Sequence, residues 1–326
     1  MDLADAALEA QVVDGLGLVE EGLREAAKTE EALLAEASRH LIDAGGKRFR
    51  ATLVLLAAQF GNPRDPRVVP AAVAIELTHL ATLYHDDVMD EAVIRRGHAS
   101  ANSRWDNTVA ILTGDYLFAR ASRIVADLGE DAIRIQAETF AQLVHGQIAE
   151  TIGPRPGQDP LEHYLRVVKD KTASLIATAG RFGAMLSDAP RAVTGRMAPA
   201  CEALGIAFQL SDDILDVASD SAESGKTPGT DLREGIRSLP VLHALADPGP
   251  AGGRLTELLT APGGLTDPAL HSEALSLLRA HPAMEAARAD LRYWATVARD
   301  QITALPEVSA RAAFEALCDY VVVRTG

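Results

Sequence analysis

Apolar residues recur three and four positions apart along most of the chain, separated by short runs rich in Gly, Pro and charged residues. This spacing is that of amphipathic α-helices, and no stretch shows the two-residue alternation of a half-buried strand. The expected helices cover residues of about 5–43 as a pair, 47–60, 67–96, 108–128, 131–152, 161–186 and 193–217, with several more towards the C-terminus. We therefore predict an all-α fold, a single large helical bundle formed by residues 1–326.

Composition and charge narrow the class of protein. Hydrophobic residues make up 48% of the chain and aromatic residues only 4%, which suits closely packed helices better than sheets. The net charge of −15 argues against a nucleic-acid partner, because a phosphate backbone requires a basic face. Cys201 and Cys318 lie far apart and form no CxxC pattern, so neither a disulfide framework nor a zinc site is expected. The acidic N-terminus lacks the apolar core of a signal peptide, and no apolar run reaches the roughly 20 residues of a transmembrane segment. We expect a cytoplasmic protein.

Two acidic segments interrupt otherwise apolar helices. Each has aspartates at positions i, i+1 and i+4, which places them on neighbouring parts of one helix face. Such crowding of like charge destabilises a helix unless a cation neutralises it, and oxygen-only ligands suit Mg²⁺. A solvated acidic face is the alternative for one segment alone, but the repeat favours two motifs that share several Mg²⁺ ions. The six candidate metal ligands are Asp86, Asp87 and Asp90 in the first motif, and Asp212, Asp213 and Asp216 in the second.

These motifs resemble those of a known family. ELTHLATLYHDDVMD at 76–90 and FQLSDDILD at 208–216 are similar to the two aspartate-rich motifs of trans-isoprenyl diphosphate synthases, and further matches run from GGKRFR at 45–50 to the C-terminal third. The resemblance implies an isoprenoid-synthase bundle that encloses a central cavity, and a homodimer. The chain departs from the family pattern at Ala51, where Pro is usual, and at Ile236, where Lys is common. The role of Arg237 beside it stays unassigned.

Two clusters of basic residues occur in the first third of the chain. Residues 47–50 follow a Gly-Gly break at a helix start, where backbone N–H groups favour an anion, and Arg95 and Arg96 follow the motif. Either group alone could be ordinary solvated charge, but in an acidic protein both together indicate diphosphate receptors. The resemblance implies that isopentenyl diphosphate is held by Lys47, Arg50, His79 and Arg96, and that Arg95 contacts an allylic prenyl diphosphate.

The resemblance also assigns roles in the middle of the chain. Lys171 and Thr172 would face the leaving diphosphate, although a Lys on an apolar helix usually extends to water. Gln209 would direct its side-chain dipole at developing positive charge. Lys226 lies in the polar segment 218–234, which has the composition of a lid that excludes water.

The implied reaction is a Mg²⁺-dependent prenyl transfer. The allylic diphosphate ionises, isopentenyl diphosphate attacks the cation, and a proton is lost, with Asp86, Asp90, Lys171, Gln209 and Asp212 as the catalytic set. Three alternatives stay open. His85 suggests a metal phosphohydrolase, which needs further His ligands. A terpene cyclase usually carries a different second motif, and the small subunit of a heteromeric synthase lacks these motifs.

Product length depends on the residues just before the first motif. In this family the fifth and fourth residues before its first Asp commonly close the tunnel for the product, and here they are Ala81 and Thr82. Both are small, which predicts a long hepta- to nonaprenyl product of the kind used for quinone side chains. We also expect peripheral membrane contact when the product is released. A geranylgeranyl or shorter product is the alternative. Tyr84 is bulky but points about 160° away from Asp86, so we expect it to pack elsewhere.

Overall fold

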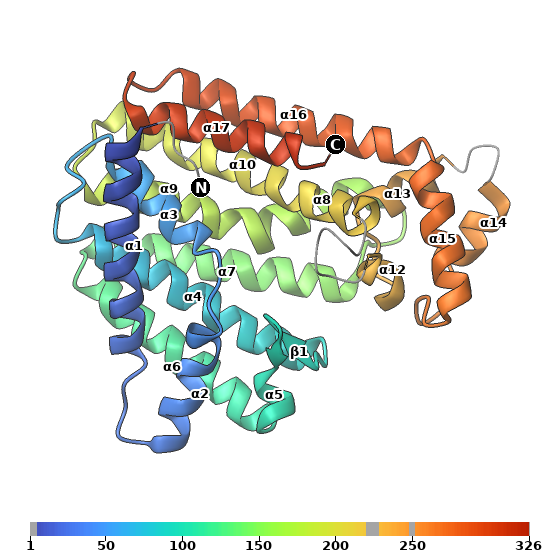
Figure 1. Ribbon diagram of the computed structural model, residues 1–326, viewed down its shortest axis with the longest axis horizontal. Helices are drawn as coiled ribbons and strands as arrows, with labels where there is room; N and C mark the ends of the chain where they lie inside the picture. The colour runs from blue at the N-terminus through green and yellow to red at the C-terminus, as the bar shows by residue number, and fades with distance from the viewer. Residues whose placement is uncertain (1–4, 220–227, 248–251, 326) are drawn as a thin grey trace. The chain divides into compact units, whose positions relative to one another are not determined.

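The computed structural model describes residues 5–219, 228–247 and 252–325, nearly all of them in helices (Figure 1). The prediction of an all-α fold is confirmed. Contacts between Cα atoms group the chain into two compact units, the first Met1–Ala141, Leu175–Cys201 and Ile302–Phe314, and the second Gln142–Ser174, Glu202–Gln301 and Glu315–Gly326. The first acidic motif lies in the first unit and the second motif in the second. Among the helices of the described residues, none is both long and apolar enough to cross a bilayer.

Helix α4 is the central element of the first unit. It runs from Val68 to Met89 and is apolar on every side for most of its length, because other helices surround it. The helices packed against it are α1 (Ala6–Ala26), α3 (Phe49–Ala58), α5 (Ala101–Arg104) and α6 (Asn107–Ala126), and α2 (Ala32–Asp43) packs against α6 (Figure 1). The acidic motif therefore projects from the end of a rigid, buried helix.

The chain leaves α4 earlier than the periodicity predicted. The helix ends at Met89, and a two-stranded antiparallel hairpin follows, with strands β1 (Ile94–Arg95) and β2 (His98–Ala99). Arg96 and Gly97 form its turn with φ of 52° and 77°, as a two-residue turn with positive φ at both positions requires. The prediction that Arg95 and Arg96 continue the helix was wrong, as was the expectation of no strand.

The second unit contains shorter helices that begin with Asp-Pro pairs. Asp159 and Asp267 each accept two backbone N–H groups at the starts of α8 and α15, and Pro follows each, so no N–H of the first turn is lost. A π-helical segment, η1, follows α8 directly and contains Lys171. The helices of this unit alone are α8 (Pro160–Val168), α12 (Thr230–Glu234), α13 (Leu239–Ala246), α14 (Gly252–Leu259) and α15 (Pro268–Ala280), with η1 at Lys169–Ala173.

Among the described helices, five contribute residues to both units. They are α7 (Glu130–Ile152), α9 (Ser174–Leu186), α10 (Arg191–Ala218), α16 (Ala283–Thr303) and α17 (Ser309–Val323). The second acidic motif lies near the C-terminal end of α10, as the periodicity predicted.

Candidate active site

Four arginines surround His79 in the first unit. Two flank the start of α3, and two lie on the hairpin that follows α4. Burial lowers the pKa of His79 well below its ordinary value, and the nearby positive charges of Arg50, Arg96, Arg48 and Arg95 lower it further. His79 is therefore a neutral imidazole in a strongly positive region, two turns of helix before Asp86.

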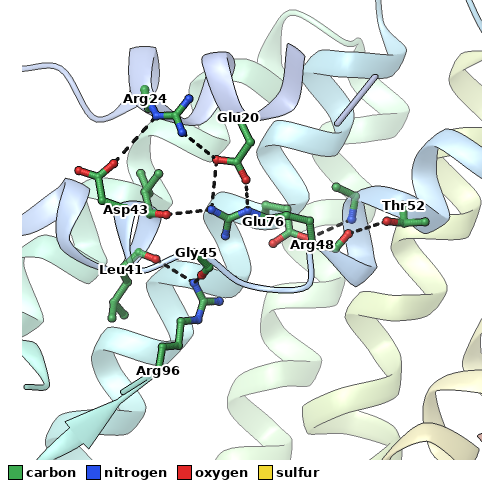
Figure 2. A network of polar contacts seen from close by, with 11 residues as sticks. Glu20, Arg24, Leu41, Asp43, Gly45, Arg48, Thr52, Glu76 and Arg96 are labelled. Carbon is green, nitrogen blue, oxygen red and sulfur yellow. Dashed lines mark hydrogen bonds and ion pairs between the residues drawn. The ribbon is translucent and has the colours of Figure 1, made fainter. Parts of the chain in front are cut away.

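Arg96 joins the hairpin to the loop between α2 and α3. Its guanidinium donates to the carbonyl oxygen of Leu41 at 2.8 Å and to that of Gly45 (Figure 2). At Gly46, φ is 154° and a Cβ would lie 3.0 Å from the guanidinium carbon of Arg96. The Gly-Gly break therefore admits the arginine as well as ending a helix, a close approach that only Gly allows without strain.

The side chain of Arg48 is held by hydrogen bonds to other parts of the protein. Its Nε donates to Glu20 at 2.5 Å and its Nη2 donates to the carbonyl oxygen of Ile42 at 3.0 Å, while its own carbonyl accepts from the hydroxyl of Thr52 (Figure 2). The residue precedes α3 with a φ of 46°. Arg48 thus fixes the loop that carries Lys47, an exposed residue, and the start of α3, where Arg50 lies in the first turn.

The guanidinium of Arg50 is not fully hydrogen-bonded among the described residues. Its Nε is buried and makes no hydrogen bond among the described residues. Burial lowers the pKa of Arg50, the charge of Glu76 raises it, and Arg96 lowers it. Glu76 is itself buried, and its carboxylate accepts from the backbone N–H of Ala51 at 2.9 Å. Positive charge therefore exceeds negative charge around Arg50, which is the condition for binding an anion.

The carboxylates of the first motif differ in exposure. Asp86 is partly buried, and Asp90 is exposed at the C-terminal end of α4. Asp87 is fully buried and accepts from Nε of Arg95 at 2.6 Å. Burial raises the pKa of Asp87, and the charge and hydrogen bond of Arg95 lower it. Asp87 thus ties the hairpin to α4, whereas Asp86 and Asp90 reach the surface.

Two residues near the motif pack against other helices. The hydroxyl of Tyr84 is buried and donates to the carbonyl oxygen of Ala37 at 2.5 Å, so the expectation that Tyr84 packs elsewhere is confirmed. Nε2 of His85 lies 3.3 Å from the carboxylate of Asp115 on α6. A histidine directed at α6 does not supply the ligand that a metal phosphohydrolase needs.

A small cavity lies further along the same helix. Ala81 is fully buried, and the hydroxyl of Thr82 donates to the carbonyl oxygen of His79 at 2.8 Å. Ala74 and Thr78 line the cavity and share a helix face with Ala81. Its other lining residues come from the first unit too: Ile75, Val125, Gln136, Thr139, Leu175, Thr178 and Phe182.

In the second unit, two aspartates of the second motif bind protein donors. Asp213 is buried and accepts from the hydroxyl of Tyr164 at 2.5 Å, from Nε2 of Gln209 at 3.0 Å and from the N–H of Leu239 at 3.1 Å. Burial raises the pKa of Asp213, and these three hydrogen bonds lower it. The carboxylate of Asp216 accepts from the first N–H groups of α12, at 3.1 Å each.

The third aspartate, Asp212, has a different partner. It is exposed, and one of its oxygens lies 2.8 Å from Nη2 of Arg324 near the C-terminus. Sequence analysis missed Arg324 and Tyr164, because each is a single residue outside any motif. Among the residues that the structure describes, no three His, Cys, Asp or Glu side chains converge on one metal position.

The π-helical segment contains two predicted residues, and one of them, Thr172, contacts the second motif. The hydroxyl of Thr172 donates to Oε1 of Gln209 at 3.2 Å. Nζ of Lys171 forms an ion pair with Glu150. A π-helical turn inside a longer helix is often found at functional sites. The predicted lid residue Lys226 lies outside the described residues.

Comparison with known proteins places these features in context. The profile of the polyprenyl synthetase family matches residues 31–266. The nonaprenyl diphosphate synthase of Mycobacterium tuberculosis is 49% identical, over 100% of this chain and 97% of that protein. Component 2 of the heptaprenyl diphosphate synthase of Geobacillus stearothermophilus is 38% identical, over 94% of this chain and 95% of that protein. A crystal structure of geranylgeranyl pyrophosphate synthase from Corynebacterium glutamicum, complexed with calcium and isoprenyl diphosphate, matches with a TM-score of 0.89 at 42% identity and covers 100% of both chains.

Proposed function

The chain belongs to the polyprenyl synthetase family and is a prenyltransferase, and from this premise we propose that it extends an allylic diphosphate by repeated condensation with isopentenyl diphosphate. The product is an all-trans prenyl diphosphate of long chain. The identity of 49% with a nonaprenyl diphosphate synthase over the whole chain supports this proposal.

The observation that carries the proposal is the positive region around His79. Arg48, Arg50, Arg95 and Arg96 all act on His79, in a protein whose net charge is −15. Such a concentration of buried cations lowers stability unless an anion binds there. We assign isopentenyl diphosphate to this region, held by Lys47, Arg50, His79 and Arg96, with Arg95 towards the allylic diphosphate.

The acidic residues suit a divalent cation. Asp86, Asp90 and Asp212 offer only oxygen donors at or near the surface, which is the donor set of Mg²⁺ with substrate phosphates in its shell. Bound Mg²⁺ would neutralise the negative charge that develops on the departing diphosphate. We assign Asp87, Asp213 and Asp216, which accept protein hydrogen bonds, to holding each motif in shape.

The protein's own groups would then act on the reacting substrates. Lys171 stabilises the leaving diphosphate as a cation. Gln209, held by Thr172 and Asp213, directs its amide oxygen dipole at the allylic cation. Lys226 is assigned to the substrate phosphates as a further cation. The released diphosphate accepts the proton lost after condensation.

Product length follows from the face of α4 beneath Asp86. Ala81 is small and buried, and Ala74 and Thr78, which follow on the same helix face, line a cavity of about 10 Å³. One helical turn is about 5.4 Å, close to the length of one extended isoprene unit. A growing chain that passes Ala81 and Thr82 therefore gains several units before it stops. We propose a hepta- to nonaprenyl product.

A shorter product is the second candidate. It is favoured by the similarity to a geranylgeranyl pyrophosphate synthase, at 42% identity over both whole chains. We further propose that the enzyme acts in the cytoplasm as a homodimer and contacts a membrane surface when it releases product. The heptaprenyl relative is named as one component of its enzyme, so a partner chain is the alternative assembly.

A direct experiment tests the activity. Purified protein is incubated with Mg²⁺, labelled isopentenyl diphosphate and farnesyl diphosphate, and label in the organic extract is counted with and without EDTA. We expect Mg²⁺-dependent incorporation that Asp86→Ala and Asp212→Ala abolish while their circular dichroism spectra stay those of the wild type. Near-normal turnover in either variant would contradict the metal assignment.

A further inference from the structure

We propose that Arg324, on the turn after α17, is a positioning residue for the second acidic motif. It fixes the carboxylate of Asp212 by one oxygen and leaves the other oxygen for a divalent cation. This inference rests on the proposed role of Asp212 as a metal ligand. Both residues lie in the second unit.

Arg324 is anchored by groups other than Asp212. Its Nε donates to the hydroxyl of Ser211 at 2.6 Å, and its Nη2 donates to the carbonyl oxygen of Phe208 at 3.0 Å. The guanidinium carbon lies 4.5 Å from the ring centre of Phe208 and 5.7 Å from that of Tyr320. Stacking on two rings and two hydrogen bonds hold a planar guanidinium in one orientation. The arginine therefore occupies this position whether or not Asp212 ionises or binds a ligand.

The ion pair uses only part of the carboxylate. Oδ1 of Asp212 lies 2.8 Å from Nη2, and the side chain of Asp212 is 46% exposed against 11% for Arg324. The other two carboxylates of the motif accept hydrogen bonds from Tyr164 and from the start of α12. Of the three, Asp212 combines exposure with a fixed partner. This is the arrangement in which an outer partner orients a ligating carboxylate.

Arg324 has two opposite effects on a bound cation. Removal of the outer partner of a ligand typically weakens metal binding 10- to 100-fold. The repulsion between the guanidinium and a divalent ion about 6 Å away would weaken binding roughly threefold, because the site is exposed and salt screens it. Orientation therefore outweighs repulsion, and loss of Arg324 is expected to weaken binding by roughly 3- to 30-fold.

The test measures metal binding without turnover. Mn²⁺ is titrated into the full chain by electron paramagnetic resonance, with inorganic pyrophosphate present to complete the ion's shell. The variants are Arg324→Met, which keeps an apolar stem, Arg324→Lys, which keeps the charge, and Ser211→Ala, which removes one anchor. Arg292→Met is the matched control, because Arg292 is half-exposed on α16 and its guanidinium forms an ion pair with Glu285 at 2.7 Å. Asp212→Asn measures the effect of losing the carboxylate that is proposed to bind the cation.

We expect Arg324→Met to weaken Mn²⁺ binding about tenfold, Arg324→Lys and Ser211→Ala to weaken it less, and Arg292→Met to leave it unchanged. In the double variant with Asp212→Asn, Arg324→Met should have no further effect. Unchanged or tighter binding in Arg324→Met, when Asp212→Asn has lost binding, would overturn the inference and leave the proposed function intact. Wild-type binding in Asp212→Asn would overturn the metal role of Asp212 instead. If Arg324→Met fails to fold, Ser211→Ala and Arg324→Lys decide the question by the same comparison.

Discussion

Replacement of Arg50 by Met should have opposite consequences for binding and for stability. Arg50 is partly buried, its Nε has no hydrogen-bond partner among the described residues, and burial and Arg96 both lower its pKa. The folded protein therefore carries the cost of a poorly compensated cation. We propose that isopentenyl diphosphate supplies the missing negative charge.

The expected size of each effect follows from these contacts. A hydrogen bond to a charged group contributes about 1.5–3 kcal/mol, so loss of the guanidinium should weaken isopentenyl diphosphate binding roughly 10- to 150-fold at about 1.4 kcal/mol per tenfold. Met fills a similar volume without a charge. The charge of Arg96 also interacts with that of Glu76. The buried carboxylate of Glu76 therefore keeps a cationic neighbour in the variant. Stability should therefore stay equal or rise.

Two measurements separate these effects. Calorimetric titration gives the dissociation constant of isopentenyl diphosphate, and urea unfolding gives the midpoint for wild type and Arg50→Met. Arg64→Met is the matched control, because Arg64 is exposed in the loop before α4, and it should change neither value. The reasoning is refuted if Arg50→Met binds isopentenyl diphosphate as tightly as the wild type, or if its unfolding midpoint falls steeply.

Three further variants test other parts of the account. Ala81→Phe should shorten the product, since a bulky ring would replace a buried methyl group beneath Asp86; an unchanged product distribution would place the tunnel floor elsewhere. The lowered pKa of His79 means that the unfolded chain binds a proton that the folded chain does not, so stability is lost as pH falls below about 6.5. Between pH 7.5 and 5.5 the wild type should lose up to about 1.4 kcal/mol more than His79→Gln, measured by urea unfolding, and equal losses would contradict a neutral His79. Tyr164→Phe removes one of three donors to buried Asp213 and should cost about 1–3 kcal/mol; an unchanged urea midpoint would show that the hydroxyl adds nothing.

The sequence was most informative where a pattern repeats. Helical periodicity predicted the α-helices, because buried faces recur every three to four residues. The repeated aspartate spacing located both acidic motifs on helices, and the structure places them near the ends of α4 and α10. The basic residues at 47–50 were identified by their position after a Gly-Gly break, and the structure confirms that a helix begins at Phe49.

What the sequence could not predict depends on single long-range contacts. Asp87 has the same chemistry as Asp86, and only the hairpin that brings Arg95 to it shows that it is buried. That hairpin was missed because two-residue strands carry no periodicity, although Arg96-Gly97 is a usable turn signal. Arg324 lies 112 positions from Asp212 by sequence numbering, and no local pattern connects them. Such pairs become visible only when the fold brings them together.

The most direct test of the central claim is the length of the product. Purified protein is incubated with Mg²⁺, isopentenyl diphosphate and farnesyl or geranylgeranyl diphosphate, and the dephosphorylated products are resolved by chain length. We predict polyprenols of seven to nine isoprene units, formed only with Mg²⁺. A product that stops at four units would contradict the role given to Ala81 and the cavity beyond it, and no product from the purified chain would contradict its action as a synthase without a partner.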